Sequence, residues 1–377
     1  MNVDQALPLL AGLTPQVFMK RHWQKKPLLI RQAVPGMQPL LDRAALFELA
    51  GRDDVESRLV EQIAKKGESA WRFRHGPFAR RALPPLSRAQ WTLLVQGVDL
   101  HEDAVHALMN QFRFVPDARL DDLMISYASD GGGVGPHFDS YDVFLLQAQG
   151  RRRWRIGRQT DLSLKPNMPV KILANFVPEQ EFVLEPGDML YLPPRYAHDG
   201  VAVGGDCMTY SIGFRSAQRD EMAREMLQRL ADDALALVGE ARYPDPQQSA
   251  VLTPAAIPES LTVFARQALL AALKDEKVLP RLLGEYLSEP KSQVWFDANA
   301  KVKFSGGVVL DRRTRMMYDQ HHVFINGESY RASGADARLM RRLADARCLD
   351  AQSVAKSSEE AKVLLRSWGE DGWLQQG

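Results

Sequence analysis

Residues 131–146 read GGGVGPHFDSYDVFLL and place a histidine and an aspartate two positions apart behind a run of glycines. Alternate side chains of an extended strand share a face, so His137 and Asp139 are expected to project together. The stretch EPGDMLYLPPRYAHDG at 185–200 provides His198 after a short apolar strand. Two histidines and one carboxylate are typical of an iron site that keeps coordination positions open. The alternative is that His137 caps a turn and His198 is a surface histidine.

Composition limits the class of protein. The chain has 377 residues, 45% of them hydrophobic, and a formal net charge of +1, so nothing attracts it generally to nucleic acid. Two cysteines are too few for a disulfide framework, and no apolar stretch approaches the ~20 residues of a membrane span. The N-terminus lacks the pattern of a signal peptide. We therefore expect a cytoplasmic protein without a membrane segment.

The hydrophobic period changes twice along the chain. Short β-rich runs separated by Gly, Pro and Asp dominate the first part and predict an antiparallel barrel or sandwich. From about residue 216 the apolar residues recur at helical spacing, which predicts helices. In the last part, Asn326-Gly327 between two strand-like runs predicts a hairpin, and Ser357 and Glu360 have the spacing of a helix capping box. An α+β fold in three parts is expected: residues 1–215 with a barrel core at about 95–215, a helical region at 216–290, and a winged-helix-like module at 291–377.

The segment GRRRWRI at 150–156 carries an arginine on each face of a predicted strand. Arg152, Trp154 and Ile156 share the apolar face, so Arg152 is expected to point into the barrel. An unpaired guanidinium there is costly and needs an anion. A dicarboxylate co-substrate would provide one through bidentate pairing. The alternative is that Arg152 pairs with a buried Asp or Glu of the chain itself.

Small polar side chains are expected on the inner faces of two further strands. In the segment MTYSIGF at 208–214, Thr209 and Ser211 alternate with large apolar residues and predict a cavity with hydroxyl donors. Ser126 is the polar residue of the strand-like run LMISY. Ser126, Thr209 and Ser211 are therefore candidates for binding the co-substrate, although Ser126 fits a surface face of an edge strand equally well.

These motifs together resemble the Jumonji-C family of iron(II)- and 2-oxoglutarate-dependent oxygenases, which have a cupin-like double-stranded β-helix. The likeness is to the bacterial ribosomal oxygenases and rests on FMKRHWQKKPLLIR (18–31), SRLV (57–60), HGPF (75–78), WTLLVQGV (91–98) and the stretches 114–157 and 185–200. It covers nearly the whole chain in the same order and is strongest from about 110 to 215. In that group the oxygenase domain is followed by a helical dimerisation region and a winged helix, so a homodimer is implied.

The resemblance implies a role for individual residues. His137, Asp139 and His198 match the iron ligands, and Arg152 matches the arginine that binds the far carboxylate of 2-oxoglutarate. Ser126 fits a position lining the co-substrate pocket. One departure is Arg195, where the general cupin pattern often has glycine; it removes no ligand but can change the pocket mouth.

The implied reaction uses 2-oxoglutarate and oxygen to hydroxylate the β-carbon of an arginine in the large-subunit ribosomal protein L-sixteen. An arginine substrate needs an acid and an aromatic wall, for which Asp122 and Tyr141 are the candidates. The alternatives are that Asp122 caps a strand edge and that Tyr141 belongs to the core.

Other functions remain open at this level. The same iron chemistry could serve a small molecule or a methylated lysine. A different class is a nucleic-acid-binding regulator with a vestigial cupin, because arginines are frequent between Lys301 and Cys348. Acidic residues are interspersed there, so nucleic acid is not the expected partner. The remaining histidines are expected to be structural.

Overall fold

The two longest strands, β6 (Val143–Gly157) and β9 (Ala197–Phe214), organise the first part of the chain. They pair antiparallel along their length, so the first half of β6 lies against the second half of β9, and the reverse. Register shifts interrupt the pairing at Gln147, Gln149 and Arg151 of β6. Because bulges bend and twist a strand, the pair can contribute to both walls of a barrel.

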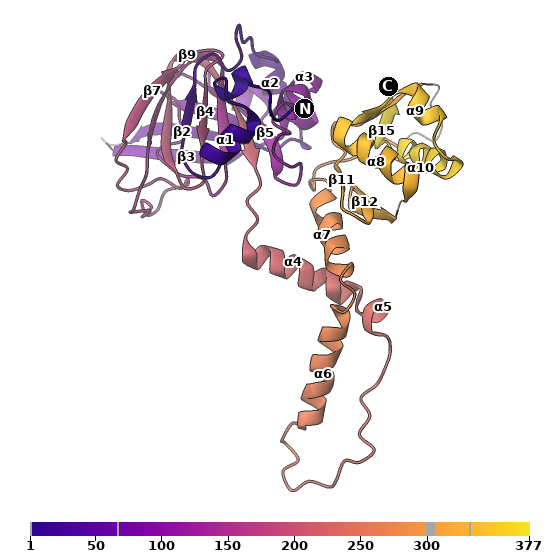
Figure 1. Ribbon diagram of the computed structural model, residues 1–377. Helices are drawn as coiled ribbons and strands as arrows, with labels where there is room; N and C mark the ends of the chain where they lie inside the picture. The colour runs from indigo at the N-terminus through magenta and orange to yellow at the C-terminus, as the bar shows by residue number, and fades with distance from the viewer. Residues whose placement is uncertain (1, 66–67, 299–305, 332) are drawn as a thin grey trace. The chain divides into compact units, whose positions relative to one another are not determined.

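The computed structural model describes the chain except for residues 1, 66–67, 299–305 and 332. It separates into two units, Met1–Ser216 and Ala217–Gly377 (Figure 1). The further division of the second unit near residue 290 stays a prediction. None of the described helices combines the length and the apolar character that crossing a bilayer requires.

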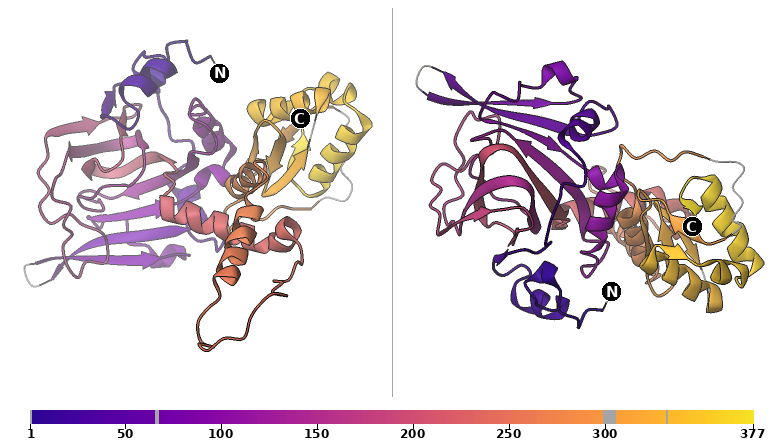
Figure 2. Two further views of the ribbon diagram at one scale, coloured as in Figure 1. Left: turned by 60° about the horizontal axis from the view of Figure 1, so that its bottom comes forward. Right: turned by 90° about the horizontal axis from the view of Figure 1, so that it is seen from above.

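Among the described residues of the first unit, nine strands form one sheet in the order β1-β8-β6-β9-β5-β4-β2-β3, with β7 paired to β6. Figure 2 shows the strands curving around an interior. The other strands are β1 (Leu28–Ile30), β2 (Ser57–Lys65), β3 (Glu68–His75), β4 (Trp91–Val95), β5 (Leu120–Ala128), β7 (Gln180–Leu184) and β8 (Met189–Leu192).

The sheet begins before residue 95, whereas the bounds of the barrel core, at about 95–215, stay a prediction. Strand β4 ends at Val95, and the β2–β3 hairpin extends the sheet beyond it. The apolar alternation of β2 is broken by Arg58 and Glu61, one on each face of the strand, and this hid it from periodicity.

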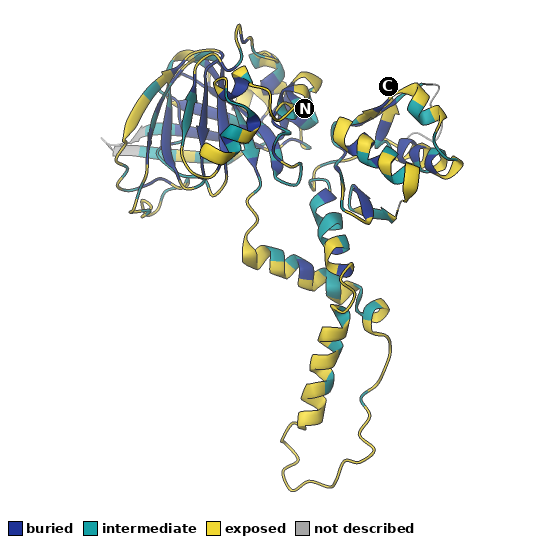
Figure 3. Cartoon of the chain, in the orientation of Figure 1, coloured by how far each residue is buried: buried dark blue, intermediate teal, exposed yellow. Residues whose placement is uncertain are grey.

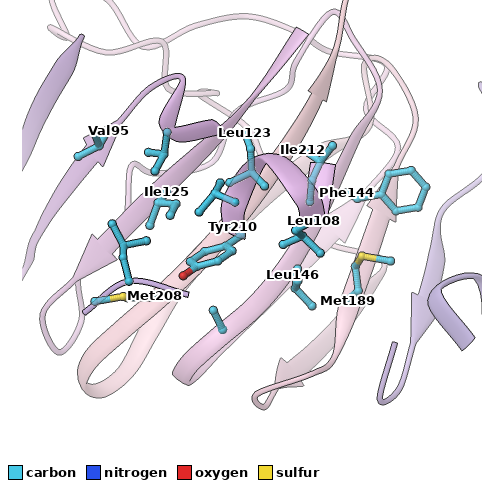
Figure 4. Close-up of a cluster of buried hydrophobic side chains, with 14 of the residues drawn as sticks. Val95, Leu108, Leu123, Ile125, Phe144, Leu146, Met189, Met208, Tyr210 and Ile212 are labelled. Atoms are coloured by element: carbon cyan, nitrogen blue, oxygen red, sulfur yellow. The ribbon is translucent and has the colours of Figure 1, made fainter. Parts of the chain in front are cut away.

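Helices cover the outer face of the sheet. They are α1 (Pro15–Arg21), α2 (Arg43–Leu49) and α3 (Asp103–Asn110). Helix α1 begins where the Thr14 side chain accepts a hydrogen bond from the Val17 amide, with Pro15 in the first turn. Leu123, Phe144, Tyr210 and other buried side chains fill the space between sheet and helices (Figure 4). The opposite face of the same strands is left to line the barrel interior.

The glycine-rich stretch before His137 is not a strand. It follows β9 through single hydrogen bonds, from the Gly131 amide to the Ala202 carbonyl and from the Ala202 amide to the Gly132 carbonyl. A Cβ built on Gly133 would lie 2.5 Å from the Gly200 carbonyl oxygen. The glycine at this position therefore allows a close approach of the two backbones.

The second unit contains four helices after the barrel and then a mixed module among its described residues. The helices are α4 (Arg219–Asp232), α5 (Ala234–Val238), α6 (Glu259–Ala272) and α7 (Val278–Ser288). The module comprises β10 (Val308–Leu310), β11 (Met316–Tyr318), β12 (His322–Ile325), β13 (Glu328–Arg331), α8 (Gly334–Ala346), β14 (Cys348–Leu349), α9 (Ala351–Ala355), α10 (Glu359–Glu370) and β15 (Leu374–Gln376).

Two local predictions fall in this module. Asn326 and Gly327 connect β12 to β13 with φ of 49° and 92°, as a two-residue hairpin requires, so the hairpin is confirmed. The capping box was placed one residue early. Ser358, not Ser357, accepts the hydrogen bond from the Ala361 amide, and the Ser357 hydroxyl donates to the Val354 carbonyl.

The approach at Gly133 gives a stability prediction. Gly133→Ala forces backbone apart, because the new methyl meets the Gly200 carbonyl, and should cost about 1–3 kcal/mol of unfolding free energy. Gly205→Ala is the matched control, since its Cβ would meet nothing within 4 Å. Thermal unfolding of the two variants measures the difference; equal midpoints would show that the glycine-rich segment moves away from β9 without cost.

Candidate functional site

His137 and His198 are joined by their main chains. The His137 amide donates to the His198 carbonyl at 3.0 Å, and the His198 amide donates to the His137 carbonyl at 2.8 Å. The ring centroids lie 4.3 Å apart. His137 occupies an isolated bridge rather than the strand that we expected, but the bridge brings the two rings side by side all the same.

Both rings are oriented by a backbone carbonyl. The His137 Nδ1 lies 2.8 Å from the Gly135 carbonyl, and the His198 Nδ1 lies 3.0 Å from the Tyr196 carbonyl. A carbonyl only accepts, so each Nδ1 carries the proton and each Nε2 offers a lone pair. This is the orientation of histidines that bind metals.

Asp139 completes the cluster. Its Oδ2 lies 3.7 Å from the His198 Nε2, and one ligand atom from each of His137, Asp139 and His198 lies within 4.8 Å of the others. The described residues contain no second group of three such side chains. Burial, and next the neighbouring His137, lowers the pKa of His198 to about 4. A neutral imidazole at pH 7 is the form that binds a metal.

Arg195 supports this cluster through its backbone. Its φ of 63° lies in the left-handed region, which explains why glycine suits this position. Its amide donates to the Asp139 carbonyl at 2.7 Å, and its side chain is exposed.

A cavity of about 550 Å³ opens beside the three ligands. Of the predicted site residues, His137, Asp139, His198, Arg152, Ser126, Ser211, Asp122 and Tyr141 line it. Thr209 is not among the lining residues; its hydroxyl donates to the Gln147 Oε1 at 3.0 Å. A role for Thr209 in binding the co-substrate thus stays a prediction.

Arg152 lies inside the barrel, as the alternation predicts, with 5% of its surface exposed. Its Nη1 is 3.4 Å from the Ser126 hydroxyl, while Nε and Nη2 have no hydrogen-bond partner. The guanidinium also lies 5.6 Å from the centroid of the Trp154 ring. Donors of a buried cation without a partner fit an anion with at least two acceptor oxygens.

A carboxylate and a phenol also line the cavity. Asp122 is 3% exposed, and its Oδ2 accepts from the Gln96 Nε2 at 2.7 Å and from the Gly97 amide at 3.1 Å. Tyr141 is 38% exposed. Burial of its hydroxyl raises the Tyr141 pKa, and Asp139 and Asp122 raise it further. The phenol is therefore a neutral donor that faces carboxylates.

Sequence reasoning missed two residues that line the cavity, Arg58 and Gln96. The Arg58 Nη2 donates to the Gln96 Oε1 at 2.6 Å. Strand β2, which carries Arg58, precedes the predicted core, and Gln96 follows β4 at the start of that core. The available signal was weak: each is a polar residue beside an apolar run, SRLV at 57–60 or WTLLV at 91–95.

Known proteins share this architecture. A family described as the JmjC domain matches residues 107–222, and one described as a ROXA-like winged helix matches residues 270–375. The ribosomal protein uL16 3-hydroxylase of Escherichia coli is 37% identical over 285 residues, 74% of this chain and 72% of the relative. The chain belongs to the JmjC ribosomal oxygenases. This confirms the family and the α+β fold class that the sequence motifs predicted.

Other relatives of this ribosomal oxygenase agree over a longer range. A probable ribosomal oxygenase of Haemophilus influenzae is 28% identical and covers 99% of this chain and 98% of its own. The structure of YcfD from E. coli in complex with cobalt and 2-oxoglutarate covers 97% of this chain and 98% of its own, with 29% identity and a TM-score of 0.80.

The unpartnered guanidinium gives a prediction for the ligand-free oxygenase. Arg152→Met removes buried donors without partners, so the free protein should gain about 1–3 kcal/mol in unfolding free energy. It should also lose the rise in melting temperature that 2-oxoglutarate and a divalent metal give the wild type. Thermal unfolding with and without these ligands measures both. A variant that is less stable without ligands, or stabilised as much by 2-oxoglutarate, would contradict the assignment.

Proposed function

We propose that this chain is an iron(II)- and 2-oxoglutarate-dependent protein hydroxylase. His137, Asp139 and His198 would hold the iron, and Arg152 with Ser126 would hold the far carboxylate of 2-oxoglutarate. The observation that carries this proposal is the buried Arg152 guanidinium, with donors lacking partners, in the cavity beside the ligand cluster. Ser211 lines the same cavity, and Thr209 lies next to Gln147.

Relatives support the cofactors. YcfD of E. coli has been solved in complex with cobalt and 2-oxoglutarate, and also in complex with cobalt and succinic acid. When bound, iron(II) with 2-oxoglutarate and oxygen supplies the oxidising chemistry, in which 2-oxoglutarate becomes succinate and carbon dioxide. The chain itself contributes fixed histidine rings, a cation for the co-substrate and a buried interior that limits water.

The proposed substrate is an arginine of ribosomal protein uL16, hydroxylated at its β-carbon. The E. coli relative carries this protein in its name, as a uL16 3-hydroxylase. Asp122 would pair with the substrate guanidinium, and Tyr141 would form a wall of its pocket. A carboxylate beside a neutral phenol suits a guanidinium, since it offers charge and a flat surface together. A ribosomal substrate implies a cytoplasmic site of action.

The second unit gives little support to the alternative that the chain is a nucleic-acid-binding regulator. Several arginines of 301–348 are already engaged: Arg313 with Asp311, Arg342 with Asp350, and Arg341 with backbone carbonyls. Paired cations are less available to phosphates.

We also infer a homodimer formed through the helical region. Helix α6 has no fully buried residue within its own unit and is largely exposed (Figure 3). Its exposed apolar side chains are Leu261, Val263, Leu269 and Leu270, of which Leu269 is 71% exposed. A helix with such side chains gains stability when a second copy covers it.

The homodimer is tested by replacing one of these side chains. Leu269→Asp should lower the sedimentation coefficient to that of a monomer, because a carboxylate is costly in an apolar interface. Leu86→Asp, at an exposed leucine of the first unit, is the matched control and should stay dimeric. A wild type that sediments as a monomer would exclude the homodimer.

The hydroxylation is tested by mass spectrometry of ribosomal large-subunit proteins incubated with the purified chain, iron(II), 2-oxoglutarate and oxygen. We expect a gain of one oxygen on an arginine peptide of uL16, and none with Asp139→Ala, which lacks a metal ligand. Turnover of 2-oxoglutarate without modification of uL16 would keep the oxygenase and exclude this substrate. The absence of both would exclude the proposed chemistry.

A further inference from the structure

A second guanidinium lines the cavity, and one side chain links it to the carboxylate proposed for the substrate. Arg58 of β2 lies opposite Leu94 of β4 in the sheet, and Gln96 follows two positions later on the same face. Diagonal neighbours of this kind are within reach of long side chains. The Arg58 Nη2 also lies 3.8 Å from the Met124 sulfur, so the guanidinium turns toward the cavity wall.

The Gln96 amide lies between this cation and Asp122. Its Oε1 accepts from Arg58 at 2.6 Å, and its Nε2 donates to the Asp122 Oδ2 at 2.7 Å. A guanidinium only donates and a carboxylate only accepts, so this orientation of the amide is the one that satisfies both neighbours. One amide group therefore separates two opposite charges that would otherwise attract each other directly.

We propose that Gln96 is a specificity-determining positioning residue, which keeps the resident Arg58 guanidinium off Asp122 so that the guanidinium of an arginine substrate pairs with this carboxylate instead. The inference rests on the proposed function and deepens it. Arg58 is tethered to the same sheet, so its effective concentration at Asp122 would exceed that of a protein substrate. Gln96 gives Arg58 a neutral acceptor, and Glu56 lies 3.6 Å from its Nε on the other side.

The decisive comparison is between Gln96→Ala and the double variant Gln96→Ala/Arg58→Ala. Without the amide, Arg58 reaches Asp122 and competes with the substrate. The KM for an arginine peptide of uL16 should rise about tenfold or more, because a charge-assisted pair contributes on this scale, and kcat should change less. Removing Arg58 as well should restore most of the affinity. A purely structural role for Gln96 predicts the opposite, that the second substitution adds to the damage.

Two further variants keep the test decisive. If Gln96→Ala does not fold, Gln96→Met takes its place in the test. It retains the length of the side chain but makes neither hydrogen bond, so the same rise in KM is expected. Arg58→Ala alone should lower the peptide KM, because it removes a cation that competes with the substrate guanidinium for Asp122. A wild-type KM in Gln96→Ala, or no rescue by Arg58→Ala, would overturn the proposal.

A readout independent of turnover separates this inference from the proposed function. A crystal structure of full-length Gln96→Ala without ligands should place an Arg58 nitrogen within about 4 Å of an Asp122 oxygen, the range of an ion pair. An Arg58 side chain that stays in its wild-type position would overturn the inference. If the wild type modifies no arginine peptide, the proposed substrate fails, and the structure of the variant still decides the role of Gln96.

Discussion

Two main-chain hydrogen bonds join His137 to His198, one in each direction, and the geometry of the site follows from them. They hold two segments that are distant in sequence side by side next to the cavity, with His137 directly opposite His198. Each Nδ1 then meets a carbonyl two residues earlier in its own segment, so the backbone alone sets the tautomer and direction of both rings. Asp139, held by the Arg195 amide, needs only to point the same way as His137. Few side chains are involved, which makes the ligand arrangement depend on the path of the backbone.

Opposite charges line one cavity. The buried cation Arg152 and the buried carboxylate Asp122 both belong to its lining, together with Tyr141. In the proposed function, a dicarboxylate pairs with Arg152 and the substrate guanidinium pairs with Asp122. Gln96 belongs to this arrangement, because its amide accepts from Arg58 and donates to Asp122.

Local alternation predicted the direction of Arg152 and of Ser211, since each lies in a strand whose other face is apolar. It could not predict that bulges at Gln147 and Gln149 shift the phase of β6, so that Leu145 and Arg152 both face the interior. Nor could it find Arg58 and Gln96, whose roles arise only when β2, β4 and β5 lie side by side. Thr209 has the correct face but is engaged by Gln147, a partner that depends on the same bulges. The spacing of residues within one segment thus predicted which face each side chain takes, whereas the register between segments could not be predicted from the sequence.

The ends of the sheet have a consequence for behaviour in a crowded solution. Strand β1, at one end, has only three residues. Strand β3, at the other, carries Arg72 and Arg74 around the buried Glu61 carboxylate, to which Arg88 also contributes an ion pair. Short or charged edge strands resist pairing with strands of another molecule. The two ends of this strand order are thus poor templates for the edge-to-edge pairing that leads to aggregation.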